Sequence, residues 1–376
     1  MKEKIKSICK RWFITAFSGM AQGLFCTLIA GTILAMVADL IKRIAGQNYV
    51  SDTLSFIASI AKILMGAGIG VGIAHALGKS KLLIFSAAVA GLIGAWADQL
   101  IPGGGGLTAI TGKMGSALPG NPIGAYVVTM LVVEIVELYA GKTKLDIILI
   151  PIGSLLLSFI GIFVAYPFIW LISQLGVLIA LATNATPFVM GVVIAVIMGI
   201  VLTMPTSSAA IWVSVALPVI SGYTKGEVSA EIYNAMLLAG GASTVGCACH
   251  MVGFAVASYR ENGVSGLISQ GLGTSMLQIP NIMKKPVIML PMIISSAICG
   301  PLATCVFALR CGSDGGGMGT SGLVGVIDLF KYTDGALGII GIFLLMFVLP
   351  AVLNIVISEF MRKKNWIKLG DMKLDD

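Results

Sequence analysis

The chain has 376 residues, of which 57% are hydrophobic and only 11% are Asp, Glu, Lys or Arg. A soluble domain carries about 25% charged residues, so this chain has too few charges to cover a folded soluble surface. Its mean hydropathy is +0.99. The roughly 214 apolar residues would fill about ten transmembrane helices of about 20 residues each. This composition excludes a soluble enzyme and a nucleic-acid-binding protein, and it predicts a polytopic membrane protein.

Ten apolar runs follow one another along the chain, and we expect each to form a transmembrane helix. They are Phe13–Val37, Thr53–Gly78, Leu82–Ile101, Ile123–Ala140, Ile147–Leu175, Pro187–Met204, Ser207–Ser221, Ala235–Ser258, Val287–Leu309 and Leu337–Phe360. The first run is about twice as long as the apolar part of a secretory signal, so we expect an uncleaved helix. No polar stretch is long enough to bury a core of its own, which predicts one transmembrane domain over residues 1–376.

Basic residues indicate the orientation of this domain. If the N-terminus is cytoplasmic, the inside segments hold 17 Lys or Arg and the outside segments hold 6, while Lys62 lies within a run. Such an excess is the usual signal for the cytoplasmic side. The sequence therefore predicts an all-α polytopic membrane protein of about ten transmembrane helices, with both termini in the cytoplasm.

Three segments rich in Gly, Ser, Thr and Pro interrupt this pattern: Ile101–Asn121, Arg260–Pro286 and Cys311–Gly325. Non-helical backbone beside apolar residues is typical of re-entrant hairpins, which are tolerated in a membrane where they line a polar cavity. The alternative is that these segments are surface loops.

Two carboxylates lie on the predicted helix at 123–140. Glu134 and Glu137 are three residues apart and therefore share one helix face. Counting back from Lys142 places Glu134 about 12 Å into the membrane, where an ionised group is costly. We expect Glu134 either to bind substrate without a strong partner or to belong to a structural ion pair, with Lys62 as a candidate partner.

A histidine lies near the middle of the run at 235–258. Cys247, Cys249 and His250 resemble a metal-binding triad, but no fourth ligand stands nearby, and the two cysteines point about 200° apart on a helix. We therefore expect no metal site and no cofactor. His250 either binds a substrate hydroxyl in a cavity or is satisfied by neighbouring helices. No Ser/His/Asp set indicates a hydrolase, so we expect no catalytic residues.

Further polar residues gather at breaks between helices. Met204-Pro205 is followed by Thr206, Ser207 and Ser208, whose hydroxyl groups could bind a polar ligand or pack between helices. Asn121 precedes Pro122 and is a candidate both for helix capping and for ligand contact.

The segment after His250 carries four more candidate substrate-binding residues, which are Thr274, Ser275, Gln278 and Asn281. We predict that His250, this hairpin and the break at 205–208 form one mobile unit, with Glu134 facing the same cavity.

The sequence also resembles a known family at several ordered motifs. These are Gly19–Phe25, Asn121–Ala125, Gly141–Asp146, Met251–Phe254, Arg260–Gly263 and the Gly273–Asn281 string. They are similar to the second family of EIIC, the membrane subunit of bacterial phosphotransferase sugar systems, which includes the perfringolysin-regulator-like proteins. The Gly-Ile-Thr-Glu sequence that carries the sugar-binding Glu in related proteins is absent here, so Glu134 and His250 do not follow from that motif.

The resemblance implies a ten-helix sugar carrier, often a homodimer, in the inner or plasma membrane of a bacterial cell. No IIA or IIB domain is fused to the chain, so phosphorylation of the sugar would need a separate cytoplasmic IIB protein. Two other functions stay open at this point. One is an ion-coupled or facilitative carrier of a small polar solute without phosphorylation, and the other is a membrane sensor or regulator.

Overall fold

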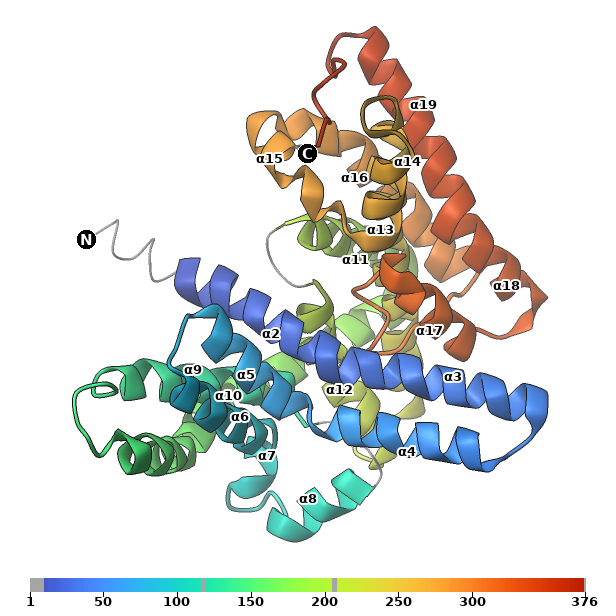
Figure 1. The fold of residues 1–376 in the computed structure, drawn as a ribbon. Helices are drawn as coiled ribbons and strands as arrows, with labels where there is room; N and C mark the ends of the chain where they lie inside the picture. Colours follow the sequence, from blue (N-terminus) through green and yellow to red (C-terminus); the bar gives the residue numbers. More distant parts are fainter. Residues whose placement is uncertain (1–9, 116–119, 205–207, 375–376) are drawn as a thin grey trace. The chain divides into compact units, whose positions relative to one another are not determined.

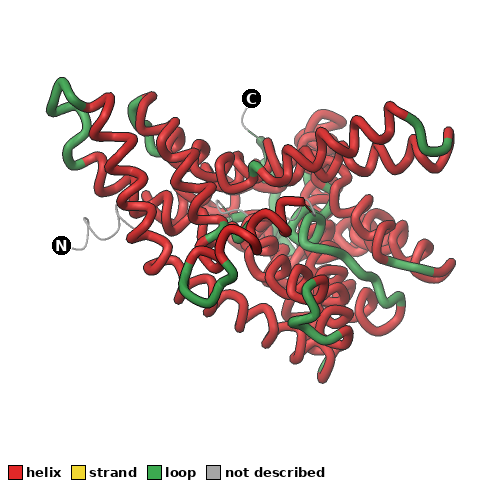
Figure 2. The backbone as a smooth tube through the Cα atoms, turned by 90° about the horizontal axis from the view of Figure 1, so that it is seen from below, coloured by secondary structure: helices red, strands yellow, loops and turns green. Residues whose placement is uncertain are grey.

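The structure is a computed structural model that describes residues 10–115, 120–204 and 208–374. Its regular elements in these ranges are all helices or helical turns, so the predicted all-α class is confirmed (Figure 2). The chain divides into two compact units, Met1–Gln174 and Leu175–Asp376. Each unit is described here by itself.

The first unit contains nine α-helices, the last of which continues into the second unit. They are α2 (Phe17–Leu24), α3 (Ala30–Ala45), α4 (Tyr49–Ile63), α5 (Met65–Ala76), α6 (Lys81–Ala95), α7 (Ala97–Leu100), α8 (Gly106–Gly115), α9 (Pro122–Glu137) and α10 (Asp146–Ala185). A π-helical turn, Phe25–Ile29, joins α2 to α3. Helices α3 and α4 pack side by side as an antiparallel pair (Figure 1).

Polar side chains define where several of these helices begin. Asn48 accepts a hydrogen bond from Ser51 N, and the Ser51 hydroxyl accepts one from Asn48 N, which together form a capping box at α4. Ser80 caps α6 by accepting a bond from Leu83 N. These caps satisfy N–H groups that the first turn of a helix cannot pair internally.

Glycines allow the helices of the first unit to approach one another closely. A Cβ at Gly72 of α5 would overlap the carbonyl oxygen of Gly19 on α2, and one at Gly23 would overlap that of Gly68. The same arrangement recurs between Gly66 of α5 and Gly91 of α6. Helices in lipid gain most from such close van der Waals packing, because no hydrophobic effect drives them together.

The second unit surrounds one buried helix. Its helices after α10 are α11 (Pro187–Thr203), α12 (Ser208–Thr224), α13 (Ala230–Ala257), α14 (Tyr259–Ile268), α15 (Ile279–Lys284), α16 (Leu290–Pro301), α17 (Val324–Tyr332), α18 (Gly335–Phe343) and α19 (Leu349–Lys363). Helix α13 packs against α11, α12, α16 and α19. It is apolar on all sides, as expected for a helix with neighbours all round.

In the described ranges, five stretches are long and apolar enough to cross a membrane, which supports a multi-pass membrane protein. They are Ile14–Ala35, Asp146–Ala185, Ala230–Ala257, Pro286–Val306 and Gly335–Lys363. A sixth is obtained if α4 and α5, which are bent by 53°, count as one span. The predicted apolar runs all fall on helices, but the number of ten spans stays a prediction.

Helix α10 is longer than the predicted run at 147–175. Its 40 residues correspond to about 60 Å, roughly twice the thickness of a hydrocarbon core. The helix continues through Gly176 because this glycine packs against the carbonyl oxygen of Val215 on α12, where a larger residue would not fit.

The three segments predicted as re-entrant hairpins differ in structure. Residues 101–105 form turns before α8, and residues 116–119 lie outside the described part of the chain. Segment 260–286 consists of α14 and α15 joined by short helical turns and one extended residue, Thr274. Segment 311–325 consists mostly of turns, yet Cys311, Met318 and Thr320 are buried, which argues against a surface loop.

We predict that Gly72→Ala destabilises the first unit, because the added methyl group forces α2 and α5 apart; overpacking of this kind costs about 1–3 kcal/mol. Gly112→Ala on α8 is the matched control, since a Cβ at that helical position meets no atom within 4 Å. Thermal unfolding in detergent measures both variants. An unchanged melting temperature in Gly72→Ala would contradict the close packing of α2 on α5.

Candidate functional site

His250 lies on α13 in the second unit, and its side chain is fully buried. Its Nδ1 atom is 2.9 Å from the hydroxyl oxygen of Thr203, the last residue of α11. That hydroxyl is also 3.0 Å from the hydroxyl of Ser275. Three polar side chains from α11, α13 and segment 260–286 therefore meet at one buried point, which we call the His250 cluster (Thr203, His250 and Ser275).

Glycines bring the two helices of this cluster together. A Cβ at Gly199 of α11 would lie 2.8 Å from His250 Nε2, and one at Gly246 of α13 would overlap the backbone of Ala195. The imidazole therefore lies against bare backbone rather than against a side chain. Its Nε2 atom is buried and has no hydrogen-bond partner among the described residues.

The Thr203 hydroxyl determines what His250 can bind. It is 3.1 Å from the Gly199 carbonyl and 3.0 Å from the Ser275 hydroxyl, and it gives its one proton to one of these oxygens or to His250 Nδ1. If Thr203 donates to Nδ1, Nε2 carries the ring proton and is a donor; if Nδ1 donates to Thr203, Nε2 is an acceptor. A sugar hydroxyl can donate and accept, so it complements Nε2 in both states.

A chain of carboxamides runs through segment 260–286, and Gln278 ends the helical turn that begins with Ser275. Gln278 donates to Gln270 Oε1 at 2.8 Å, and Gln270 donates to the hydroxyl of Ser258 at 2.9 Å. Asn281 donates to Gln278 Oε1 at 2.9 Å. Gln270 and Gln278 are fully buried. These bonds fix the turn that carries Ser275, because unpaired amides would be costly in this position.

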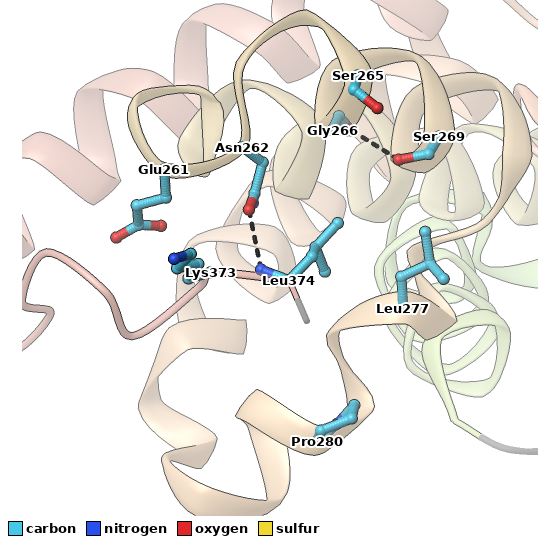
Figure 3. A pocket seen from close by; sticks show the side chains of 9 residues that line it. All are labelled: Glu261, Asn262, Ser265, Gly266, Ser269, Leu277, Pro280, Lys373 and Leu374. Atoms are coloured by element: carbon cyan, nitrogen blue, oxygen red, sulfur yellow. Dashed lines mark hydrogen bonds between the residues drawn. The ribbon is translucent and has the colours of Figure 1, made fainter. Parts of the chain in front are cut away.

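The C-terminal residues pack against the same segment. Gln278 and Asn281 donate to the carbonyl oxygens of Met372 and Lys373, and Leu374 N donates to Asn262. Figure 3 shows Asn262 and Leu374 beside a pocket of about 570 Å³. The residues that line the pocket include Glu261, Ser265, Ser269 and Lys373.

Ion pairs attach the C-terminal residues as well. Arg362 lies 3.3 Å from Glu261 Oε1, and Gly370 N donates to the same oxygen at 2.7 Å. Lys285 pairs with Asp371 at 2.7 Å. Together with the carboxamide contacts, these bonds hold residues 362–374 on segment 260–286.

The remaining candidates of the second unit have local partners. Thr274 accepts a bond from Met276 N and so begins the turn that carries Ser275. The Ser208 hydroxyl donates to Gly317 O at 2.6 Å. Thr206 and Ser207 lie outside the described residues.

In the first unit, Glu134 has an ion-pair partner, so the expectation of a carboxylate without one is wrong, whereas its contact with substrate stays a prediction. Arg11 Nε lies 3.1 Å from Glu134 Oε1, although without hydrogen-bond geometry, and Arg11 also bonds Glu137 Oε2 at 2.6 Å. Glu137 pairs with Lys79 too. Lys62, the candidate partner in the sequence, instead packs against Gly31. Helix α5 packs against α2, and this packing brings Arg11, before α2, and Lys79, after α5, to the same end of α9.

Asn121 caps α9, as one of its two interpretations predicts. Its side-chain oxygen accepts hydrogen bonds from Ile123 N at 2.9 Å and Gly124 N at 3.1 Å. Pro122 occupies the first turn, where its missing N–H costs nothing. Any contact of Asn121 with a ligand stays a prediction.

Sequence reasoning missed Thr203, Gln270 and Ser258. Thr203 sits two residues before Pro205, so the same helix break that pointed to residues 206–208 could have pointed to it. Gln270 and Ser258 have no comparable local signal, since their role depends on how segment 260–286 folds back. Near His250, Cys247 Sγ lies 3.5 Å from Met198 O, and no group of three His, Cys, Asp or Glu that could hold a metal ion occurs in the described ranges.

Apolar helices and a buried imidazole–hydroxyl cluster define a multi-pass membrane protein suited to carrying a polar solute. Residues 14–374 match the family described as Phosphotransferase system, EIIC. The chain therefore belongs to this family and transports sugar as the IIC subunit of a phosphotransferase system, which confirms the resemblance seen in the sequence. No curated protein and no solved structure matches the chain significantly.

We predict that Glu137→Gln lowers the stability of the first unit by about 1 kcal/mol or more. The side chain of Lys79 is only 6% exposed, so removing its carboxylate leaves a nearly buried charge, although the 44% exposure of Glu137 limits the effect. Glu227→Gln, at an exposed pair with Lys225, is the control and should change stability by less than about 0.5 kcal/mol. Equal effects of the two substitutions on thermal unfolding would argue against the Lys79 pair.

Proposed function

We propose that the sugar binds at the His250 cluster of the second unit. The observation that carries this proposal is the buried Nε2 atom of His250, which has no partner among the described residues while Nδ1 is held by Thr203. A buried polar atom without a partner costs about 1–3 kcal/mol. A sugar hydroxyl at Nε2 would remove this cost. Glu134 is not included in the proposed site, because Arg11 already pairs with it.

Access to the cluster requires movement, since Thr203, His250 and Ser275 are all fully buried. Two features next to the cluster favour a moving hinge. Helix α11 ends at Thr203, directly before the Pro205 break, and Ser275 lies on a short helical turn between α14 and α15. We propose that segment 260–286 shifts relative to the end of α11 to open a path to Nε2.

The IIB partner that the family implies would phosphorylate the sugar from the cytoplasmic side. We propose that segment 260–286 and residues 362–374 form this side of the second unit, because they hold three and five Lys or Arg and are paired with each other. A bacterial inner or plasma membrane location and a homodimer are part of the same proposal.

Ten spans with both termini in the cytoplasm complete the proposed arrangement. Contacts within each unit support it. Arg11 and Lys79, from two segments predicted to be cytoplasmic, meet at Glu137. Arg362 and Glu261, again from two such segments, meet in the second unit.

Cysteine labelling tests this orientation. We predict that single cysteines at Lys113 and Lys225 react with a membrane-impermeant maleimide added to whole cells, whereas one at Lys142 reacts only after the cells are opened. Labelling of position 142 in intact cells would contradict the orientation, and the Lys225 variant controls for reagent activity.

Substitutions at the His250 cluster test the binding site. Purified protein is first screened with a panel of radiolabelled hexoses, disaccharides and sugar alcohols, and the compound that binds best is used for all variants. We predict that His250→Gln and Thr203→Val weaken its binding about tenfold or more, because one buried hydrogen bond is worth about 1.4 kcal/mol in this context. Thr203→Ser keeps the hydroxyl and should retain most of the affinity.

His75→Gln is the matched control, since His75 lies in the last turn of α5 in the first unit, and this variant should bind the compound as the wild type does. If His250→Gln and Thr203→Val fold correctly and bind the compound with wild-type affinity, the sugar does not bind at the His250 cluster. If no compound in the panel binds the wild-type protein, transport in vesicles supplied with the IIB partner would decide whether sugar is carried.

A further inference from the structure

A buried carboxylate in the second unit has no role in the proposed sugar site. Asp328 lies on α17 and is 1% exposed. Its Oδ2 atom accepts hydrogen bonds from Gly312 N at 2.8 Å and Gly315 N at 3.0 Å, and Cys311 Sγ lies 3.3 Å away as a third donor. A Cβ at Gly312 or Gly315 would lie within about 3 Å of this carboxyl group, so glycines are needed for the approach.

The other oxygen of the same carboxyl group is unsatisfied. Asp328 Oδ1 is buried and has no hydrogen-bond partner among the described residues. A carboxylate that keeps its charge in such a place is stabilised through one oxygen only, and burial disfavours the charged form.

The charged and titratable groups around Asp328 come from each element that packs against it. Asp314 and Cys311 face it from the glycine-rich segment, Lys331 and Tyr332 from its own helix, and Tyr233 from α13, which also lies near Arg310. Desolvation and then the negative charge of Asp314 raise the pKa of Asp328 to about 6, against the opposing charge of Lys331. Burial also raises the pKa of Cys311, so its thiol keeps its proton.

The segment that Asp328 holds, residues 311–321, reaches toward the sugar site. Its Gly316 and Gly317 carbonyl oxygens accept bonds from Ser243 on α13 and Ser208 at the start of α12. Thr320 donates to Gly271 O at 2.6 Å and Ser321 to Gly273 O at 3.0 Å. Gly273 is two residues before Ser275. The segment therefore links Asp328 to the start of α12 and to segment 260–286, which carries Ser275.

We propose that Asp328 is a proton-binding site, and that the bound proton keeps segment 311–321 closed over α17. The ligand is a single proton on the carboxyl group. Its release leaves a charged carboxylate that is better solvated when the segment opens and water reaches Oδ1.

Linkage gives the direction of the effect. In the closed state the pKa of Asp328 is raised from its usual value of 3.8 to about 6, whereas in an open, hydrated state it returns toward the usual value. The closed state therefore binds the proton more tightly, and its advantage is lost as pH rises through about 6. Between about pH 5 and about pH 8 this shift increases the open fraction about tenfold.

Infrared difference spectra of the full chain in lipid nanodiscs test the proton site. We expect the carbonyl band of a protonated carboxylic acid to be present at about pH 5, to be lost at about pH 8 with a midpoint near 6, and to be absent in Asp328→Asn. Asp314→Asn keeps Asp328 and should move the midpoint to lower pH, because it removes a negative charge that raises the pKa.

Thiol labelling tests the coupling to segment 311–321. Cys311 is fully buried, so its labelling, resolved by mass spectrometry and divided by that of a free cysteine peptide, reports opening. This ratio should rise about tenfold from about pH 5 to about pH 8 in the wild type and stay level in Asp328→Asn.

Three results would overturn the proposal. They are a wild-type protein without the infrared band, a band that survives in Asp328→Asn, and a labelling ratio that changes with pH equally in both proteins. If Asp328→Asn does not fold, the Asp314→Asn variant tests the assignment instead. If the pH midpoint of the infrared band does not move in that variant, the band belongs to another carboxyl group and the proposal fails. None of these measurements depends on where the sugar binds.

Discussion

Close contact between helix backbones is the constraint on which the rest of the structure depends. In a lipid environment the hydrophobic effect does not drive helices together, so their association requires small residues and complementary surfaces. In the second unit, Gly246 lies against Ala195, and Gly191 of α11 lies against Gly300 of α16. The resulting distance between α11 and α13 is what lets a histidine ring reach Thr203. The polar cluster is therefore a consequence of glycine packing.

Because the helices pack closely, buried polar groups must find their hydrogen-bond partners within the protein. Buried hydroxyls such as Ser243 and Ser296 bond to backbone carbonyl oxygens, and the buried carboxamides of Gln270 and Gln278 bond to each other. His250 Nε2 and Asp328 Oδ1 are two of the eight buried side-chain atoms that lack a hydrogen-bond partner among the described residues. His250 Nε2 lies against the backbone of Gly199 on α11, and the other oxygen of Asp328 is bonded to the glycine-rich segment 311–321. A carrier needs buried polar atoms without an internal partner, because such atoms gain a hydrogen bond when substrate binds or when the protein changes conformation.

Much of the fold could be predicted from the sequence because apolar run length is a local property. The runs at 187–204 and 235–258 match α11 and α13 closely, and Asn121 caps its helix as its position before Pro122 indicates. The long helix α10 was underestimated, because Gly176 ends an apolar run in the sequence but fits a helix contact in space. The partner of Glu134 was missed, because Arg11 is more than a hundred residues away and only folding brings the two together.

The sequence by itself determined the membrane class, the helical content and the family, because each follows from composition or from residues that are neighbours in the chain. Only the tertiary structure decided which groups His250 and Asp328 meet. Thr203, His250 and Ser275 come from three elements, and the donors to Asp328 come from a glycine-rich segment more than ten residues earlier. Hydrogen bonds and ion pairs act over a few ångströms, so their partners depend on how distant segments pack, and a linear pattern does not contain that information.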